Sequence, residues 1–136
     1  MEKNIELVIC GTHKLDGQKE TFTTKCDGSY FLKNEKHYFI YEEETEHGIL
    51  KSNIKVYEDK MEVMKTGAIN MHMFFELGEV LACNYNTPYG SIPIDIYTSR
   101  LDMYVEKDHI KVVVEYEMRD RDEIFAYCDL VIEGKN

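Results

Sequence analysis

The sequence has no tryptophan, two prolines and three arginines in 136 residues. Its 26 acidic residues outnumber its 16 basic residues, which gives a formal net charge of −10. Nucleic acids and anionic membranes bind where a protein carries a positive field, and the lysines here are mixed with glutamates rather than gathered in a basic run. We therefore expect neither nucleic acid nor a membrane as a partner.

The sequence also lacks a long apolar segment and a recognisable leader. No run reaches the about 18 apolar residues of a membrane-spanning helix. Residues 1–4 lead directly into the strand-like residues 5–10, without the apolar region or the cleavage site of a signal peptide. These features predict a cytoplasmic location.

No Cys-x-x-Cys spacing occurs among the four cysteines, which are Cys10, Cys26, Cys83 and Cys128. Each lies within a strand-like segment, so we expect reduced thiols packed as small apolar groups. A metal site built from Cys10, His13 and distant partners is an alternative, but we predict no metal and no cofactor.

Helical periodicity is absent as well, because no window of a dozen residues keeps apolar side chains at positions i, i+3, i+4 and i+7. The hydrophobic fraction is 43% and the aromatic fraction 12%, too high for a disordered chain. The length suits one domain that spans residues 1–136. The expected class is therefore all-β.

The clearest pattern lies in residues 69–90. Side chains alternate along its first arm, so that one face is apolar, with Ile69, Met71, Met73, Phe75 and Leu77. Gly78 suits a short hairpin turn, residues 80–85 form the returning arm, and residues 86–90 form a second turn.

Similar segments precede and follow this hairpin. We expect strands at residues 3–14, 20–25, 29–33, 37–44, 50–57, 60–66, 92–105, 110–118 and 124–133, with turns that include Asp16-Gly17, Asp27-Gly28 and Glu58-Asp59. The alternation changes phase between Ile96 and Leu101, which predicts a bulge near Thr98 to Arg100. Pro93 indicates that this strand begins at an edge or a bulge.

About ten strands joined by short turns predict an antiparallel meander. An open sheet of ten twisted strands is disfavoured, so the sheet should close or split into a sandwich. Hairpin connections favour a single closed or nearly closed up-and-down barrel of about 8–10 strands.

Several segments resemble one family. They are Tyr41-Glu42-Glu43, Ile54-Lys55-Val56, Gly67, the Met73 and Phe75 pair, Tyr85-Asn86-Thr87-Pro88-Tyr89-Gly90 and Thr98. Together they resemble the YwiB-like family of small uncharacterised bacterial proteins over nearly the whole chain. The resemblance implies a lipocalin-like, calycin-type closed barrel and no established activity. Since tryptophan is absent, the Gly-x-Trp signature of true lipocalins is missing.

A closed barrel of this size can hold one small ligand inside or at its mouth. We predict a partly apolar ligand, with an anionic group as one option, lined by Met73, Phe75, Tyr85, Arg100 and Tyr116. Methionine adapts to irregular ligands, tyrosine combines a ring with a hydroxyl, and the guanidinium of Arg100 suits a carboxylate or a phosphate. The alternatives are that the apolar stripe is ordinary core and that Arg100 forms a surface ion pair.

Motifs for catalysis are missing: there is no Gly-rich phosphate loop, no Gly-x-Ser-x-Gly elbow and no paired-histidine spacing. The glutamates of residues 42–46 suit a solvated edge better than an acid–base pair. We name no catalytic residue and favour a binding protein over an enzyme. The second hypothesis is a protein-interaction module, a monomer or homodimer that docks through a strand edge or the rim near Pro88 and Tyr89.

Overall fold

The computed structural model describes residues 2–87 and 90–136, and the side chains of residues 4–84 and 90–136. The described chain forms ten strands: β1 (Glu2–Leu15), β2 (Gln18–Lys33), β3 (Lys36–Thr45), β4 (Gly48–Tyr57), β5 (Lys60–Gly67), β6 (Asn70–Glu76), β7 (Val80–Thr87), β8 (Gly90–Val105), β9 (His109–Asp120) and β10 (Glu123–Lys135). None of the described segments is a helix long and apolar enough to cross a membrane.

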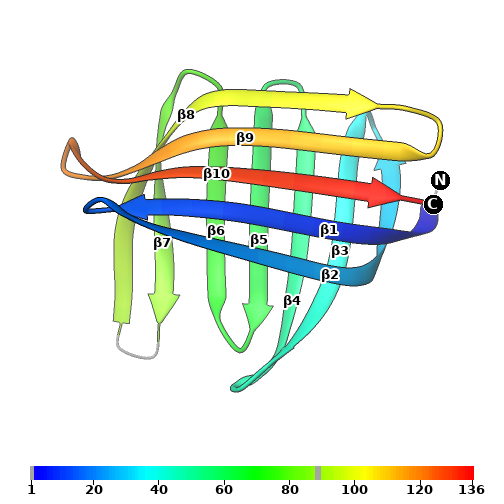
Figure 1. Ribbon diagram of the computed structural model, residues 1–136, viewed down its shortest axis with the longest axis horizontal. Helices are drawn as coiled ribbons and strands as arrows, with labels where there is room; N and C mark the ends of the chain where they lie inside the picture. The colour runs from blue at the N-terminus through cyan, green and yellow to red at the C-terminus, as the bar shows by residue number, and fades with distance from the viewer. Residues whose placement is uncertain (1, 88–89) are drawn as a thin grey trace.

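The strands form one closed antiparallel barrel. Each strand pairs with its neighbours in sequence, and β1 pairs with β10 to complete the ring. Figure 1 shows two layers: β8, β9, β10, β1 and β2 run across the front, and β3 to β7 cross behind them at a steep angle. The predicted all-β, up-and-down barrel is therefore confirmed, with ten strands.

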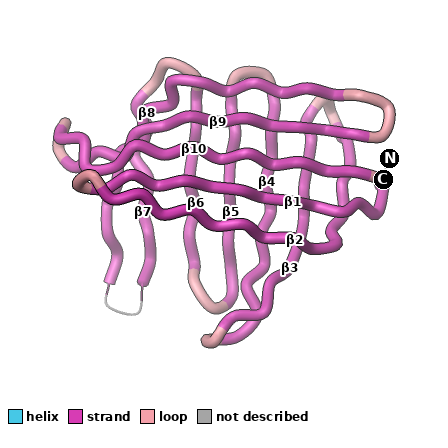
Figure 2. Tube along the Cα trace, viewed as in Figure 1, coloured by secondary structure: helices cyan, strands magenta, loops and turns pink. Residues whose placement is uncertain are grey.

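Tight turns join most of the strands (Figure 2). The β1–β2 turn has positive φ at Asp16 and Gly17, 47° and 79°, and the β9–β10 turn has positive φ at Arg121 and Asp122, 51° and 69°. Two consecutive residues of positive φ match the twist of the flanking strands in a two-residue hairpin. These turns bring two hairpins to the same end of the front layer.

One predicted turn is wrong. Asp27 and Gly28 lie inside the uninterrupted strand β2, where Gly28 pairs with Ile5 of β1 and with Tyr41 of β3. A Cβ atom at Gly28 would lie 2.5 Å from Cδ1 of Leu7 and 2.7 Å from the carbonyl oxygen of Ile40. The glycine therefore permits a close approach as β2 passes from one layer to the other, rather than a reversal of the chain.

The predicted bulge is confirmed. The register between β8 and β9 shifts between Thr98 and Arg100. Pro93 pairs with Asn84 of β7, whereas pairing with β9 begins only at Asp95. The proline thus occupies a stretch with a neighbouring strand on one side, as its missing N–H requires.

A closely packed part of the core lies in the half of the barrel beside the two chain termini, which we call the packed end. Phe39, Val112 and Ile132 are fully buried there. A Cβ atom at Gly134 would meet Ile5 at 2.8 Å. We call the opposite half, beside the β1–β2 and β9–β10 hairpins, the open end (Figure 1).

Candidate functional site: a cavity at the open end

A cavity of about 930 Å³ occupies the open end of the barrel. Its lining is mostly apolar and draws on both layers of the barrel. The apolar and tyrosine lining residues are Ile9, Phe22, Tyr41, Ile54, Val63, Met71, Met73, Cys83, Ile92, Pro93, Ile94, Ile96, Tyr116, Met118, Ile124, Phe125 and Leu130. The other lining residues are His13, Asp16, Thr24, Glu43, Lys65, Asn84, Asp120 and Glu123.

The inner end of the cavity, which we call its floor, is formed by side chains of the core. Ile54, Ile96 and Ile9 are at most 4% exposed and line the cavity from three different strands. Tyr116 is also buried there, and burial strongly raises the pKa of its hydroxyl. The floor therefore offers an apolar surface with a neutral phenol.

Half-exposed apolar side chains surround the mouth. Phe22, Ile92 and Phe125 are 44%, 50% and 40% exposed, and all three line the cavity. Phe125 lies where the β9–β10 register shifts between Ile124 and Ala126, and a bulge of this kind redirects a side chain. The mouth is thus an apolar rim on an otherwise strongly acidic protein.

Phe22 owes its place in the rim to a glycine. Gly11 is its cross-strand partner, and a Cβ atom at Gly11 would overlap the Phe22 ring. The ring also meets His13 edge to face, with centroids 5.7 Å apart. The missing side chain at Gly11 therefore lets Phe22 lie flat across β1 at the mouth.

A row of polar side chains crosses the part of the barrel wall that β3, β4 and β5 form. Ser52 pairs with Tyr41 on one side and with Lys65 on the other, so the three side chains share the inner face. Burial raises the pKa of Tyr41 to about 12, an effect that the neighbouring Ser52 hydroxyl partly offsets. The Ser52 hydroxyl is buried and has no hydrogen-bond partner of regular geometry among the described residues.

Lys65 is the one lysine among the described residues that line the cavity. Burial lowers the pKa of its ammonium group, and the nearby Glu43 carboxylate counteracts part of that shift. Neither Lys65 nor Glu43 forms an ion pair with any side chain that the structure describes. The cavity therefore holds an amine without a hydrogen-bonded counter-ion.

The five predicted lining residues have different positions. Met73 and Tyr116 line the cavity. Phe75 faces inward but belongs to the packed core, where it meets Tyr116 edge to face at 5.0 Å. The backbone of Tyr85 pairs with Met71 and Ile92, and its side chain lies outside the described residues.

The prediction that Arg100 points into the barrel is wrong. Its side chain is 44% exposed on the outer surface, where Nε lies 2.6 Å from Oδ2 of Asp102 and Nη1 lies 3.8 Å from Oε2 of Glu115. The bulge adds one residue to β8, so Leu101 rather than Arg100 resumes the inward alternation after Thr98. The surface ion pair, the alternative in the sequence analysis, is what the structure contains.

Sequence reasoning missed Lys65, Glu43 and Phe22. A signal was present for Lys65, because it has the same parity as Met61 and Val63, two residues of the buried face of β5. A charged residue in phase with an apolar face points toward the interior of the barrel. No comparable local signal marks Phe22.

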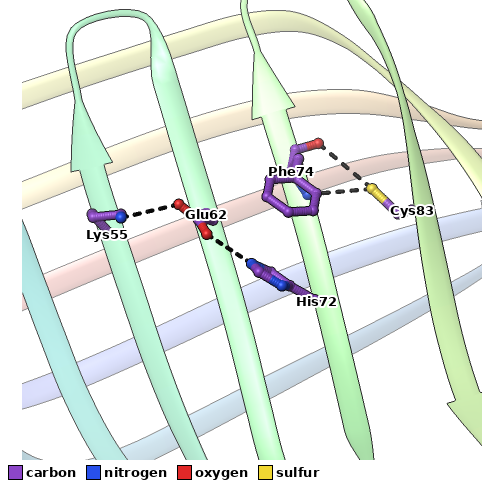
Figure 3. Close-up of polar contacts among 5 residues, drawn as sticks. All are labelled: Lys55, Glu62, His72, Phe74 and Cys83. Atoms are coloured by element: carbon purple, nitrogen blue, oxygen red, sulfur yellow. Dashed lines mark hydrogen bonds and ion pairs between the residues drawn. The ribbon is translucent and has the colours of Figure 1, made fainter.

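The barrel wall is weakest between β6 and β7. Their ladder contains only three described pairs and stops at His72 and Asn84. Beyond it, the Cys83 thiol takes the place of a ladder bond: the Phe74 amide donates to Sγ at 3.2 Å, and Sγ lies 3.8 Å from the Phe74 carbonyl oxygen (Figure 3). The side chain of one cavity residue therefore holds this seam together.

A polar cluster lies on the outer face of the same wall (Figure 3). The Glu62 carboxylate accepts from His72 at 2.7 Å and pairs with Lys55 at 3.2 Å. These contacts outweigh partial burial and lower the pKa of Glu62, and its hydrogen bond raises the pKa of Lys55. The cluster braces three strands from outside and has no access to the cavity.

The four cysteines are free, as expected; Cys83 and Cys128 are buried, and Cys10 and Cys26 are half-buried. Within residues 2–87 and 90–136, no group of three or more histidine, cysteine or carboxylate side chains is arranged to hold a metal ion. The polar groups that line the cavity are an amine, carboxylates, an imidazole, phenols, a thiol, an amide and a hydroxyl.

Comparisons with known proteins match this architecture. The family model described as Domain of unknown function (DUF1934) matches residues 7–132. The uncharacterized beta-barrel protein YwiB of Bacillus subtilis (strain 168) is 28% identical over 122 residues, which cover 90% of this chain and 86% of that protein. The crystal structure of the ywiB protein from Bacillus subtilis superimposes with a TM-score of 0.89 at 24% identity, over 99% of this chain and 92% of that one.

Proposed function

The chain belongs to the family described as Domain of unknown function (DUF1934), and from its cavity we propose that it binds one small, partly apolar molecule inside the barrel. The observation that carries this proposal is the cavity of about 930 Å³ with a mainly apolar lining. Ligand sites in proteins are typically apolar hollows of about 300–1,000 Å³ with a few polar groups. The cavity meets both criteria.

The position of the polar groups supports a ligand with one apolar and one polar end. The floor at Ile54 and Ile96 is apolar, whereas Tyr41, Glu43 and Lys65 lie on one wall. A molecule that enters tail first would bury its apolar part on the floor and keep its polar end beside this wall. The half-exposed rim at Phe22 and Phe125 would line its route of entry.

The charges of the lining argue against a simple anion receptor. Among the described residues, four carboxylates line the cavity, at Asp16, Glu43, Asp120 and Glu123, against one lysine. With Arg100 on the outer surface, an anionic ligand would meet more repulsion than attraction. A ligand without a negative charge fits this lining better.

Titration with the neutral fluorescent probe N-phenyl-1-naphthylamine tests the proposal. We expect saturable binding of one probe per chain to the wild type. Met73→Trp places an indole in the cavity and should weaken binding by at least about tenfold, a loss of roughly 1.4 kcal/mol.

Met64→Trp is the matched control, because Met64 lies on the exposed face of β5, next to Val63, which is the cross-strand partner of Met73. It should bind the probe as the wild type does. Equal loss of binding in both variants, or no binding to the wild type, would contradict the proposal. If the wild type binds the probe, native mass spectrometry of the protein purified from its own cell extract would identify any molecule that copurifies.

A second candidate function follows from the apolar rim. Phe22, Ile92 and Phe125 line the cavity and each expose a large share of their apolar surface, and exposed apolar patches often mark protein contacts. A second copy of the chain docked on this rim would close the cavity. Sedimentation velocity of the wild type and of Phe125→Ser tests this: a dimer that the substitution dissociates supports docking, and a monomer at all concentrations excludes it.

A further inference from the structure

Lys65 differs from a structural lysine in both its position and its partners. It projects from the inner face of β5 in phase with the buried Met61 and Val63, and it lines the cavity. A lysine at such a position without an ion pair is costly for the fold, because transfer of an ammonium group from water needs compensation. Methionine or leucine would fill the same place without that cost.

We propose that Lys65 is a covalent attachment site, at which the amine condenses with the carbonyl group of an apolar aldehyde held in the cavity. This inference rests on the proposed binding function and specifies the class of ligand. A desolvated lysine in an apolar pocket is the form of this side chain that attacks carbonyl compounds. The cavity supplies both the apolar surroundings and the room for the substrate.

The reaction balances without an oxidant or a metal. The unprotonated Nζ attacks the carbonyl carbon and gives a carbinolamine. Both Nζ protons then leave with the carbonyl oxygen as water, and a C=N bond remains. The imine nitrogen can take up one proton, and the Glu43 carboxylate, which acts electrostatically on Lys65, would stabilise the resulting positive charge.

Two hydroxyl groups lie beside this amine. Ser52 is 1% exposed and is the cross-strand partner of Lys65, and its hydroxyl lies beside the Tyr41 phenol, whose pKa it lowers in part. The carbinolamine hydroxyl would therefore form on a wall that already carries hydrogen-bonding groups.

The chain contains its own control for reactivity. Lys55 lies on the outer face of the same sheet, and its ammonium group pairs with Glu62 at 3.2 Å (Figure 3). That hydrogen bond raises the pKa of Lys55, whereas burial lowers the pKa of Lys65. At a pH near 8, Lys65 should therefore present more free amine than Lys55 does.

The experiment uses decanal with sodium cyanoborohydride, which reduces the imine to a stable secondary amine. Peptide mapping at pH 8, with intact mass spectrometry to count the adducts, should show that Lys65 is the first lysine to be modified. The adduct at Lys65 should form at least about tenfold faster than the adduct at Lys55, because the cavity holds the aldehyde beside an amine that lacks an ion pair. An excess of decanol, which has no carbonyl group, should slow the labelling of Lys65 and leave Lys55 unchanged.

Two variants complete the test. Lys65→Arg keeps the charge and should lose the fast adduct, and Lys55→Arg should keep it; the thermal unfolding of both variants establishes that they fold. Labelling spread evenly over the lysines, with no protection of Lys65 by decanol, would overturn the inference. If decanol displaces the fluorescent probe but decanal does not label Lys65, the covalent step fails while the binding function stands.

Discussion

The two ends of the barrel share the same strands but differ in how those strands fill the interior. At the packed end, Phe39, Val112 and Ile132 are fully buried. At the open end, Phe22 and Ile92 are 44% and 50% exposed beside a cavity of about 930 Å³. The comparison shows that closure of the barrel and filling of the barrel are separate properties of the sequence.

The difference lies in the side chains that occupy inward positions. The inner face of β5 runs from Met61 through Val63 to Lys65, so one strand contributes core at one end and an amine at the other. The inner face of β3 changes in the same way, from Phe39 through Tyr41 to Glu43. Long polar side chains do not close a core, because their charged ends must stay solvated or paired.

The largest difference between the two ends should appear on truncation of a phenylalanine. Phe39→Ala should lower the free energy of unfolding by about 3–5 kcal/mol, because it leaves a void in close-packed core. Phe22→Ala should lower it by less than about 1 kcal/mol, because this ring is already half in water. Urea unfolding followed by circular dichroism measures both, and equal losses would contradict the distinction between the ends.

Two glycine substitutions test the same difference in packing between the two ends. Gly134→Ala at the packed end should destabilise the protein by about 1–3 kcal/mol, because the new Cβ meets Ile5 at 2.8 Å with Leu7 and Phe39 behind it. Gly11→Ala also overlaps a side chain, but the Phe22 ring can swing into solvent, so the cost should be below about 1 kcal/mol. Thermal unfolding of both variants tests this, and a larger loss for Gly11→Ala would contradict it.

Lys65 should lower the free energy of unfolding of the protein at neutral pH. Lys65→Met should raise the free energy of unfolding by about 0.5–2 kcal/mol, the usual range for a better-filled interior site. Because the pKa of Lys65 is lower in the folded state, the unfolded chain binds more protons, and the cost is relieved as the pH rises toward 10.5. The gain from the substitution should therefore shrink between pH 8 and pH 10; a constant gain would point to packing alone.

The smallest expected effect concerns His37 at the packed end. Its Nδ1 and the Tyr30 hydroxyl are hydrogen-bonded at 2.6 Å, and burial lowers the pKa of the imidazole. The unfolded chain therefore takes up the proton first, so stability is fully present above pH 6.5 and falls as the pH drops below it. His37→Gln should flatten this part of the profile of melting temperature against pH, and an unchanged slope would exclude His37 as its source.

The local pattern of residues determined most of the fold. Period-two alternation along residues 69–77 and 110–118, with turn residues between such segments, predicted the strands, and their number required closure. The phase change before Leu101 located the bulge. These features are readable because strand alternation and turn geometry depend on residues close together in the sequence.

Tertiary contacts decided the rest. Gly28 continues β2 because Leu7 and Ile40 approach it, although an Asp-Gly pair alone favours a turn. The bulge placed Arg100 on the outer surface, and the burial of Met61 and Val63 against other strands decided that the face of β5 that carries Lys65 points inward. The cavity itself is the volume that the side chains of ten strands leave unfilled, so no single segment encodes it.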